Sequence, residues 1–264
     1  MDYKLLKNVL PAPLCQKLKS EALNIVESIR GPRELSIFTT KNDDARDSYF
    51  YNSLDKISIF FEEEAVSNGK LKYSKLDSTN KVGHGLHLKN EVFRNFSFSK
   101  EAKSLMKEFG FKGVDIVQSM IIFKNPKFGG EVKPHQDQTY LYSYPNTIKG
   151  LWIPLEVSKV ENGCLWVLPS KEEHLLKERY MRVENRTFVE KVNDVSWSDE
   201  DFIPIEMNIG DVLLFDGLLP HKSFKNTSST SRMAYVIHFK DQESNYSKKN
   251  WNYSDDLMRV SLDK

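Results

Sequence analysis

Two histidines and one aspartate have the residue types and the spacing to bind a transition metal. His135 and Asp137 are separated by one residue within EVKPHQDQTY, a run that we expect to form a strand over 131–140. Alternate side chains of a strand point to the same face, so both can contact one cation. His221 follows the strand-like run DVLLFDG, and a neighbouring strand of a closed sheet would bring it to the same place. Two imidazoles and one carboxylate on one side of a metal form the facial triad of non-haem Fe(II) oxygenases.

His-x-Asp alone is weak evidence, because a lone histidine is more often a hydrogen-bonded residue of the core or surface. The later part of the sequence strengthens the metal hypothesis. Arg232 comes after the turn-like residues 225–229, and a hairpin there would bring it beside His221 and Ser223. The planar guanidinium suits a carboxylate such as the distal end of 2-oxoglutarate. The alternative for Arg232 is a surface position at the end of a loop.

The elements that must position these residues change along the chain. Residues 1–112 are predicted to be mainly helical support. Pro13 is placed to begin a helix that stops at Gly31-Pro32, a second helix is expected over about 47–69, and a third over about 91–109. From Val114 onward, short β-rich runs alternate with turn signals.

The chain is therefore predicted to be one α+β domain over 1–264. Its core is a double-stranded β-helix (a jelly roll, cupin-like) over 113–241, buttressed by the N-terminal helices. A polar segment over 170–204 interrupts the strands and is long enough to act as a lid. Residues 242–264 form a C-terminal tail.

Composition narrows the class of partner. Lysine plus arginine (38) nearly equals aspartate plus glutamate (37), for a formal net charge of +1. That balance supplies no strong field for nucleic acid or an anionic membrane, so we expect a small-molecule substrate and a monomer or weak oligomer. The two cysteines, Cys15 and Cys164, are far apart, and no secretory or membrane-spanning run is apparent. A reducing compartment, the cytoplasm, is the expected location.

Three blocks carry a resemblance to a known family: QSMIIFKNPKFGGEVKPHQDQTYLY, GLWIPLEVSKVENGCLWVLP and HKSFKNTSSTSR. Over about 81–241 the sequence resembles the phytanoyl-CoA dioxygenase family. The resemblance implies a double-stranded β-helix with Fe(II) and 2-oxoglutarate as cofactors, and ascorbate as a candidate reductant. It places the iron ligands on His135, Asp137 and His221, and the partners of the co-substrate carboxylate on Arg232 and Ser223.

Three further 2-oxoglutarate contacts come from the resemblance alone. Trp152 in GLWIPLE, Met120 in QSMIIF and Lys81 in NKVGHGLHL match family positions that line the pocket. Considered without the resemblance, Trp152 and Met120 are equally consistent with core packing, and Lys81 with a solvated lysine.

One departure concerns the turn after Leu-Pro, where the family often has Pro-Gly-Ser-His. Residues 169–174 read PSKEEH here, so His174 is not assigned to the site. His84, His87 and His238 match no motif and are expected to be structural.

Together these features predict a 2-oxoglutarate- and Fe(II)-dependent dioxygenase that hydroxylates a small organic substrate and releases succinate and CO₂. Related halogenases have a small residue in place of the carboxylate, so Asp137 favours hydroxylation. Two alternatives stay open: a cupin metalloenzyme that needs no 2-oxoglutarate and hence no Arg232, and a non-catalytic protein that binds metal or 2-oxoglutarate. Thr139, Tyr140 and Tyr142 are the predicted substrate-facing residues.

Overall fold

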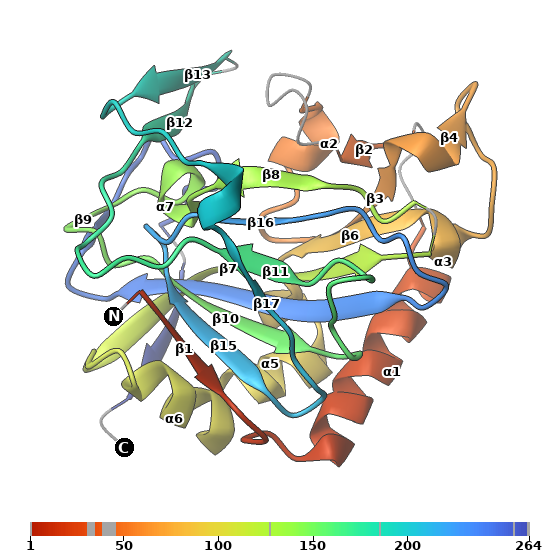
Figure 1. Cartoon of the computed structure of the whole chain (residues 1–264), viewed down its shortest axis with the longest axis horizontal. Helices are drawn as coiled ribbons and strands as arrows, with labels where there is room; N and C mark the ends of the chain where they lie inside the picture. The colour runs from red at the N-terminus through yellow and green to blue at the C-terminus, as the bar shows by residue number, and fades with distance from the viewer. Residues whose placement is uncertain are drawn as a thin grey trace.

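Two sheets that face each other, antiparallel except for one pair of strands at the edge of the larger sheet, dominate the computed structural model (Figure 1). The structure describes residues 2–30, 35–38, 46–126, 128–184, 186–255 and 257–262. The larger sheet contains, in spatial order, β1 (Tyr3–Leu6), β15 (Val212–Asp216), β10 (Lys149–Pro154), β17 (Arg232–Asp241), β7 (Gly113–Lys124), β6 (Thr79–His84), β3 (Ile57–Glu62) and β2 (Ile37–Phe38), and β19 (Met258–Ser261) also pairs with β7. The smaller sheet contains β14 (Ile203–Ile205), β11 (Leu165–Val167), β16 (His221–Ser223) and β8 (Val132–His135). This arrangement is the predicted double-stranded β-helix.

Helices cover the outer face of the larger sheet. Below the sheet in Figure 1 lie α1 (Ala12–Ser28), α5 (Glu91–Ser97) and α6 (Lys100–Lys107). The apolar positions that helical spacing predicted for α1 are buried, among them Leu18, Ala22 and Val26. The predicted stop at Gly31-Pro32 lies outside the described residues. None of the helices in the described ranges has the length and apolar character needed to cross a bilayer.

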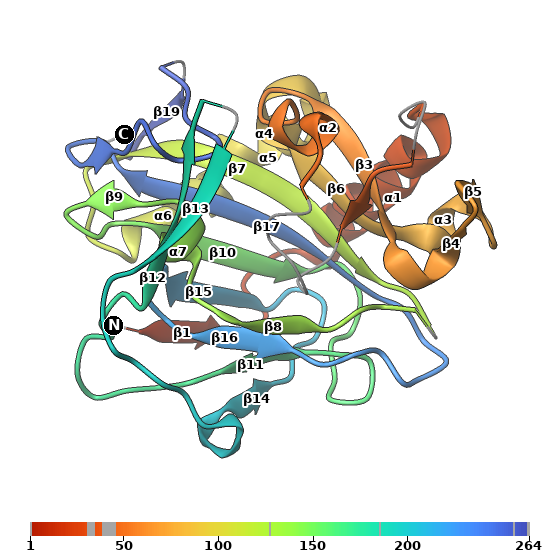
Figure 2. The same ribbon diagram turned by 90° about the horizontal axis from the view of Figure 1, so that it is seen from above.

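Strand β17 shows how the sheet serves two purposes. It lies beside β7 at the centre of the larger sheet (Figure 2). Side chains alternate along a strand, so one set of residues packs into the core beneath the helices: Met233, Tyr235, Ile237 and Phe239. The other set faces the space between the sheets: Arg232, Ala234, Val236 and His238. The functional residues of β17 thus point away from the helices.

The prediction of a second helix over about 47–69 was mostly wrong. Asp47 does cap a helix, since its carboxylate accepts a hydrogen bond from the Phe50 amide at 2.8 Å, but this helix, α2, covers only Ser48–Tyr51. The apolar run that follows is β3, whose residues are buried from Ser58 to Glu62. A strand buried on both faces shows no two-residue alternation, so an apolar run of this length can be mistaken for part of a helix.

The remaining helices in the first part of the chain are short. The expected helix over 91–109 is two helices, α5 and α6, because the Ser99 hydroxyl accepts a hydrogen bond from the Ala102 amide and starts a new helix. The other short elements are α3 (Lys75–Ser78), α4 (Leu86–Lys89), η2 (Glu63–Ala65), β4 (Val66–Ser67) and β5 (Lys70–Leu71). Strands β3 and β6 extend the larger sheet, so residues 1–112 contribute sheet as well as helix.

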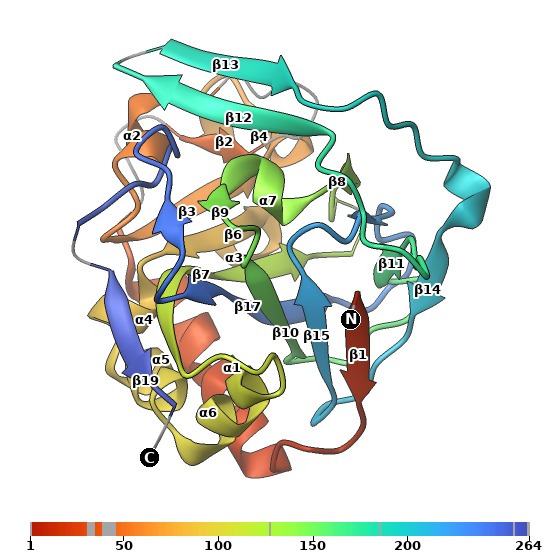
Figure 3. The ribbon, with the colours of Figure 1, turned by 90° about the vertical axis from the view of Figure 1, so that its left-hand side faces the viewer.

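A hairpin lies over one end of the molecule. It comprises β12 (Glu178–Val183) and β13 (Arg186–Lys191), within the segment 170–204 that was expected to be a polar insertion between strands. Figure 3 shows the hairpin above α7 (Asp137–Tyr140), where the Tyr180 and Tyr140 rings lie 5.6 Å apart. The last short elements are β9 (Ser143–Tyr144), β18 (Asn245–Tyr246) and η3 (Asp199–Asp201). The hairpin therefore closes one side of the space next to α7.

Candidate metal centre

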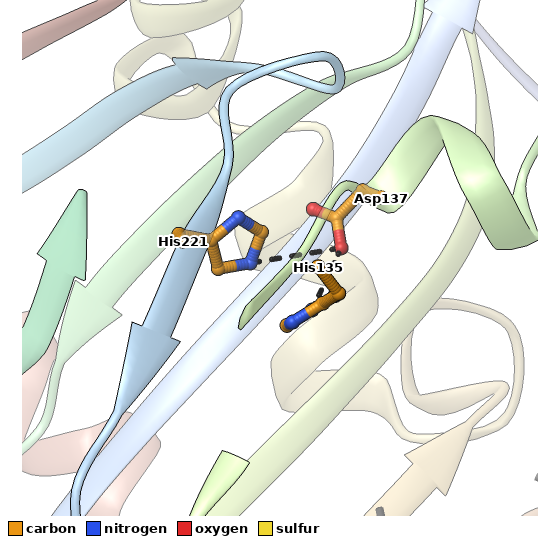
Figure 4. A group of neighbouring side chains, drawn as sticks. All are labelled: His135, Asp137 and His221. Carbon is orange, nitrogen blue, oxygen red and sulfur yellow. Dashed lines mark ion pairs between the residues drawn. The ribbon is translucent and has the colours of Figure 1, made fainter. Parts of the chain in front are cut away.

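The structure brings His135, Asp137 and His221 together between the two sheets (Figure 4). His135 ends β8 and lies directly opposite His221, the first residue of β16. The Asp137 Oδ1 atom is 3.7 Å from His135 Nε2 and 3.8 Å from His221 Nε2. Such separations can be spanned by one ion with bonds of about 2 Å. The three ligand atoms all lie within 4.8 Å of one another, close enough to bind one ion.

Asp137 reaches this position by a route that the sequence did not indicate. The expected strand over 131–140 ends at His135, and Asp137 is the first residue of the short helix α7. Gln136 forms the corner: its buried side chain donates to the Leu218 carbonyl at 2.6 Å and accepts from the Lys177 amide at 2.9 Å. Alternation along a strand thus predicted correctly that His135 and Asp137 lie close together. It did so from the wrong local structure, because the chain turns at Gln136 and does not continue as a strand.

Both imidazoles present a nitrogen lone pair to the site. His135 Nδ1 donates to the Lys133 carbonyl at 2.9 Å, and His221 Nδ1 donates to the Leu219 carbonyl at 3.0 Å. A carbonyl can only accept, so the proton lies on Nδ1 and Nε2 remains free for a metal. Burial, with His221 nearby, lowers the pKa of His135 to about 4. His135 is therefore in the neutral form that binds metals at neutral pH.

The carboxylate of Asp137 is ionised, and one of its two oxygens contacts a histidine. Burial by itself would raise its pKa, but the neighbouring His238 and His221 outweigh burial and hold the pKa of Asp137 well below its ordinary value. Its second oxygen, Oδ2, lies 2.8 Å from His238 Nε2. Two imidazoles and one carboxylate are a donor set that suits Fe(II), and the described residues offer no fourth protein ligand. The residues present therefore fit an iron centre with open positions.

A cavity of about 390 Å³ surrounds this cluster, a size typical of small-molecule sites. It is lined by the triad and by all five predicted co-substrate contacts: Lys81, Met120, Trp152, Ser223 and Arg232. The sequence thus led to residues from β6, β7, β10, β16 and β17 that line one cavity.

Arg232 is buried in the wall of the cavity, and one of its donors has no partner. Its Nε and Nη2 atoms donate to the Gly163 carbonyl at 3.2 and 2.7 Å, while Nη1 is buried and has no hydrogen-bond partner. Gly163 has a φ of +83°, and a side chain there would approach Lys124 and the Phe224 carbonyl, so glycine is needed in this turn. Burial lowers the pKa of Arg232 to about 10, which leaves the guanidinium charged at neutral pH. An anionic oxygen in the cavity can satisfy Nη1.

Lys81 is a buried residue, contrary to the solvated alternative. Only 7% of it is exposed, and its Nζ lies 3.4 Å from the centre of the Phe38 ring. Burial, reinforced by the charge of Arg46, lowers the pKa of Lys81 well below its ordinary value. Within the described part of the chain, Lys81 has no hydrogen-bonded or ion-paired partner. An anionic ligand next to this buried amine would stabilise its protonated form.

The remaining sequence assignments had mixed outcomes. Tyr140 lines the cavity, with its ring 6.1 Å from that of His135, whereas Thr139 and Tyr142 are not among the lining residues. His238 was expected to be structural but contacts Asp137 directly. Alternation along RMAYVIHF, which places His238 on the same face as Arg232, was the signal that could have found it.

Comparison with known proteins is consistent with this geometry. The model of the family described as "Phytanoyl-CoA dioxygenase (PhyH)" matches residues 3–234. A phytanoyl-CoA dioxygenase of Arabidopsis thaliana is 42% identical over 219 residues, which cover 82% of this chain and 77% of the relative. The mouse (Mus musculus) phytanoyl-CoA dioxygenase domain-containing protein 1 is 34% identical over 263 residues, covering 94% of this chain and 90% of the relative.

Solved structures share the fold at low sequence identity. EctD from S. alaskensis with 2-oxoglutarate and 5-hydroxyectoine superposes with a TM-score of 0.64 at 17% identity, covering 99% of this chain and 82% of that chain. The epimerase SnoN in complex with Fe3+, alpha ketoglutarate and nogalamycin RO gives a TM-score of 0.60 at 14% identity, covering 94% and 82%. These likenesses confirm the predicted fold class.

Proposed function

This chain belongs to the phytanoyl-CoA dioxygenase family, and on that premise we propose that it hydroxylates a small organic substrate with Fe(II) and 2-oxoglutarate, releasing succinate and CO₂. The observation that carries the proposal is the Arg232 guanidinium, whose Nη1 is buried without a partner in the same cavity as the triad. A metalloenzyme that needs no 2-oxoglutarate has no use for this donor, and leaving it buried is unfavourable.

Each group of residues has a defined role in this proposal. His135, Asp137 and His221 would hold the iron, and Arg232 with Ser223 would bind the distal carboxylate of 2-oxoglutarate. Bound together, iron and 2-oxoglutarate supply the chemistry that activates O₂.

The other predicted co-substrate contacts complete the 2-oxoglutarate pocket. Trp152 and Met120 are buried and keep water from the co-substrate. Lys81, protonated when the dianion lies next to it, would add a second positive charge to the pocket.

The substrate is proposed to lie between the triad and an aromatic wall. This wall consists of Phe50, Tyr140, Tyr180 and Trp251, all of which line the cavity. The Phe50 and Trp251 rings are 4.6 Å apart, and Tyr180 shares a hydrogen bond of 2.7 Å with Tyr51, so the wall is rigidly packed. Such a surface orients an apolar or flat group next to the metal and excludes water from it.

Succinate formation tests the proposal. Purified protein with Fe(II), 2-oxoglutarate and ascorbate should form succinate, and fractions of cell extract that contain the substrate should raise the rate. Asp137→Ala is the matched control, because it removes the ionic ligand and leaves the cavity otherwise intact. If oxidation of a substrate proceeds without 2-oxoglutarate, the cupin alternative is correct. If 2-oxoglutarate binds and succinate never exceeds the Asp137→Ala level, the protein is a non-catalytic binder.

A further inference from the structure

A row of four residues crosses the larger sheet beneath Asp137. Gln118 on β7 lies directly opposite His238 on β17, His238 is opposite Gly150 on β10, and Gly150 is opposite Phe215 on β15. Directly opposed residues of neighbouring strands share one face of the sheet. Gln118, His238 and Phe215 all line the cavity. The row therefore forms a continuous support on the floor of the metal centre.

Hydrogen bonds along the row fix the tautomer of His238. Its Nε2 lies 2.8 Å from Asp137 Oδ2, and its Nδ1 lies 3.1 Å from Gln118 Nε2. The carboxylate oxygen can only accept, so the His238 proton lies on Nε2, and the Gln118 amide donates to Nδ1. His238 is 4% exposed and Gln118 is 6% exposed, so water does not compete for these bonds.

Packing supports the same arrangement from the other side. Any side chain at position 150 would collide with the Phe215 ring, so Gly150 is what lets that ring lie flat across the strand. The ring centre of Phe215 is 5.3 Å from that of His221 and 6.2 Å from that of His238. One aromatic ring thus packs against both a triad histidine and the histidine that contacts the triad aspartate.

We propose that His238 is a positioning residue that makes Asp137 a one-oxygen ligand. A carboxylate can bind a metal through one or both of its oxygens. His238 occupies Oδ2, so only Oδ1 faces the Nε2 atoms of His135 and His221. A two-oxygen Asp137 would take up a coordination position that the co-substrate or O₂ needs. The inference rests on the proposed function, because it requires the triad to bind a metal.

The test uses Co(II) as a spectroscopic probe of the full-length protein. His238→Leu should weaken Co(II) binding by about 10- to 100-fold, the usual effect of losing such a supporting contact, and should change the visible Co(II) spectrum. His238→Gln keeps an N–H donor and should restore most of the affinity and the wild-type spectrum. His87→Leu is the matched control: this histidine is also buried, and its ring bonds Ser119 at 2.8 Å, outside the cavity lining. Its Co(II) spectrum and affinity should equal those of the wild type.

The outcomes separate this proposal from the function it rests on. If the wild type binds no Co(II), the metal centre itself is refuted. If the wild type binds Co(II) and His238→Leu keeps the same spectrum and affinity, His238 is only structural and the proposal fails. Where His238→Leu does not fold, Gln118→Leu replaces it. That variant frees the His238 tautomer and should shift the spectrum in the same direction by a smaller amount, and an unchanged spectrum overturns the proposal.

Discussion

The two faces of the larger sheet differ in what their buried side chains contact. On the outer face, Tyr235 and Phe239 of β17 pack with the helices, as in the pair of Phe93 and Tyr235, whose ring centres are 4.6 Å apart. On the inner face, Arg232 and His238 of the same strand surround a cavity. One strand thus supplies stability with every second residue and binding chemistry with the residues between.

The comparison of the two faces shows which buried groups lower the stability of the fold while serving the site. The inner face holds buried donors without partners, Arg232 Nη1 and Trp152 Nε1, each of which costs about 1–3 kcal/mol. The outer face gains free energy from apolar burial. Substitutions on the two faces should therefore have opposite signatures: loss of activity with the fold kept, or loss of stability with the chemistry kept.

The largest effect is expected for Asp137→Ala, in the cavity that the inner face lines. Removing the only anionic ligand should lower succinate formation by roughly 10⁴-fold or more, because residues that act as a unit fail together. The free energy of unfolding without metal should fall by only about 1–3 kcal/mol, the cost of leaving the buried His238 Nε2–H without its Asp137 partner. Succinate assays and urea unfolding of the same preparation check both parts. A large loss of stability would contradict the separation of the two faces.

The opposite signature is expected for Phe93→Ala on the outer face. Phe93 is fully buried, so the substitution leaves a cavity and should lower the free energy of unfolding by about 3–5 kcal/mol. Succinate formation per folded molecule should stay near the wild-type value below the unfolding temperature. Urea titration followed by circular dichroism measures the change. Loss of activity in molecules that remain folded would show that the faces are coupled.

Arg232→Met should have an intermediate effect, which falls on the affinity for 2-oxoglutarate more than on the free energy of unfolding. The affinity for 2-oxoglutarate should fall by about 10²-fold, because a charge-assisted bond to the carboxylate is lost. The unfolding free energy without ligand should change little, since the loss of the buried unpaired Nη1 offsets the loss of the two hydrogen bonds to the Gly163 carbonyl. Arg232→Lys keeps the charge without the planar fork and should bind with an affinity between the two. Calorimetric titration of 2-oxoglutarate into the Mn(II)-loaded wild type, Arg232→Met and Arg232→Lys measures the three affinities.

Sequence reasoning identified the inner face better than the local structure that forms it. The triad and Arg232 could be predicted because two weak motifs, His-x-Asp and the distant His221 with Arg232, support each other. The helical turn that begins at Asp137 could not be predicted, because it depends on the Gln136 side chain reaching Leu218 across the fold. Alternation along β17 could have placed His238 on the same face as Arg232, but its contact with Asp137 joins β17 to a segment far away in the chain and could not be predicted.

The outer face was predictable where a helix has one apolar side, as in α1. It was not predictable in β3, which is buried on both sides and therefore carries no alternation. Local periodicity reports the environment of one element, whereas sheet order and site geometry depend on long-range pairing.

The smallest predicted effect concerns pH and Lys81. Burial holds the pKa of Lys81 below its ordinary value of 10.5, so the unfolded chain binds a proton that the folded chain releases. The free energy of unfolding should therefore rise with pH across the window between the lowered pKa and 10.5. Lys81→Met removes this cost and should be more stable than the wild type by about 1 kcal/mol at neutral pH, with a difference that shrinks as the pH approaches 10.5.

Adding the ligand makes this test more specific. The anion that Lys81 is proposed to contact should offset the cost of burying the Lys81 ammonium. Adding 2-oxoglutarate with Mn(II) should stabilise the wild type more than Lys81→Met, narrowing or reversing the difference between them. The exposed Lys107, on α6, provides the control: Lys107→Met should follow the wild type with and without ligand at every pH. Thermal unfolding of the three proteins between neutral pH and 10.5 makes the comparison. The opposite result, with Lys81→Met less stable than the wild type without ligand, would show that contacts within the fold offset the cost of burying the Lys81 ammonium. The inner face would then contain fewer unpaired polar groups than its geometry indicates.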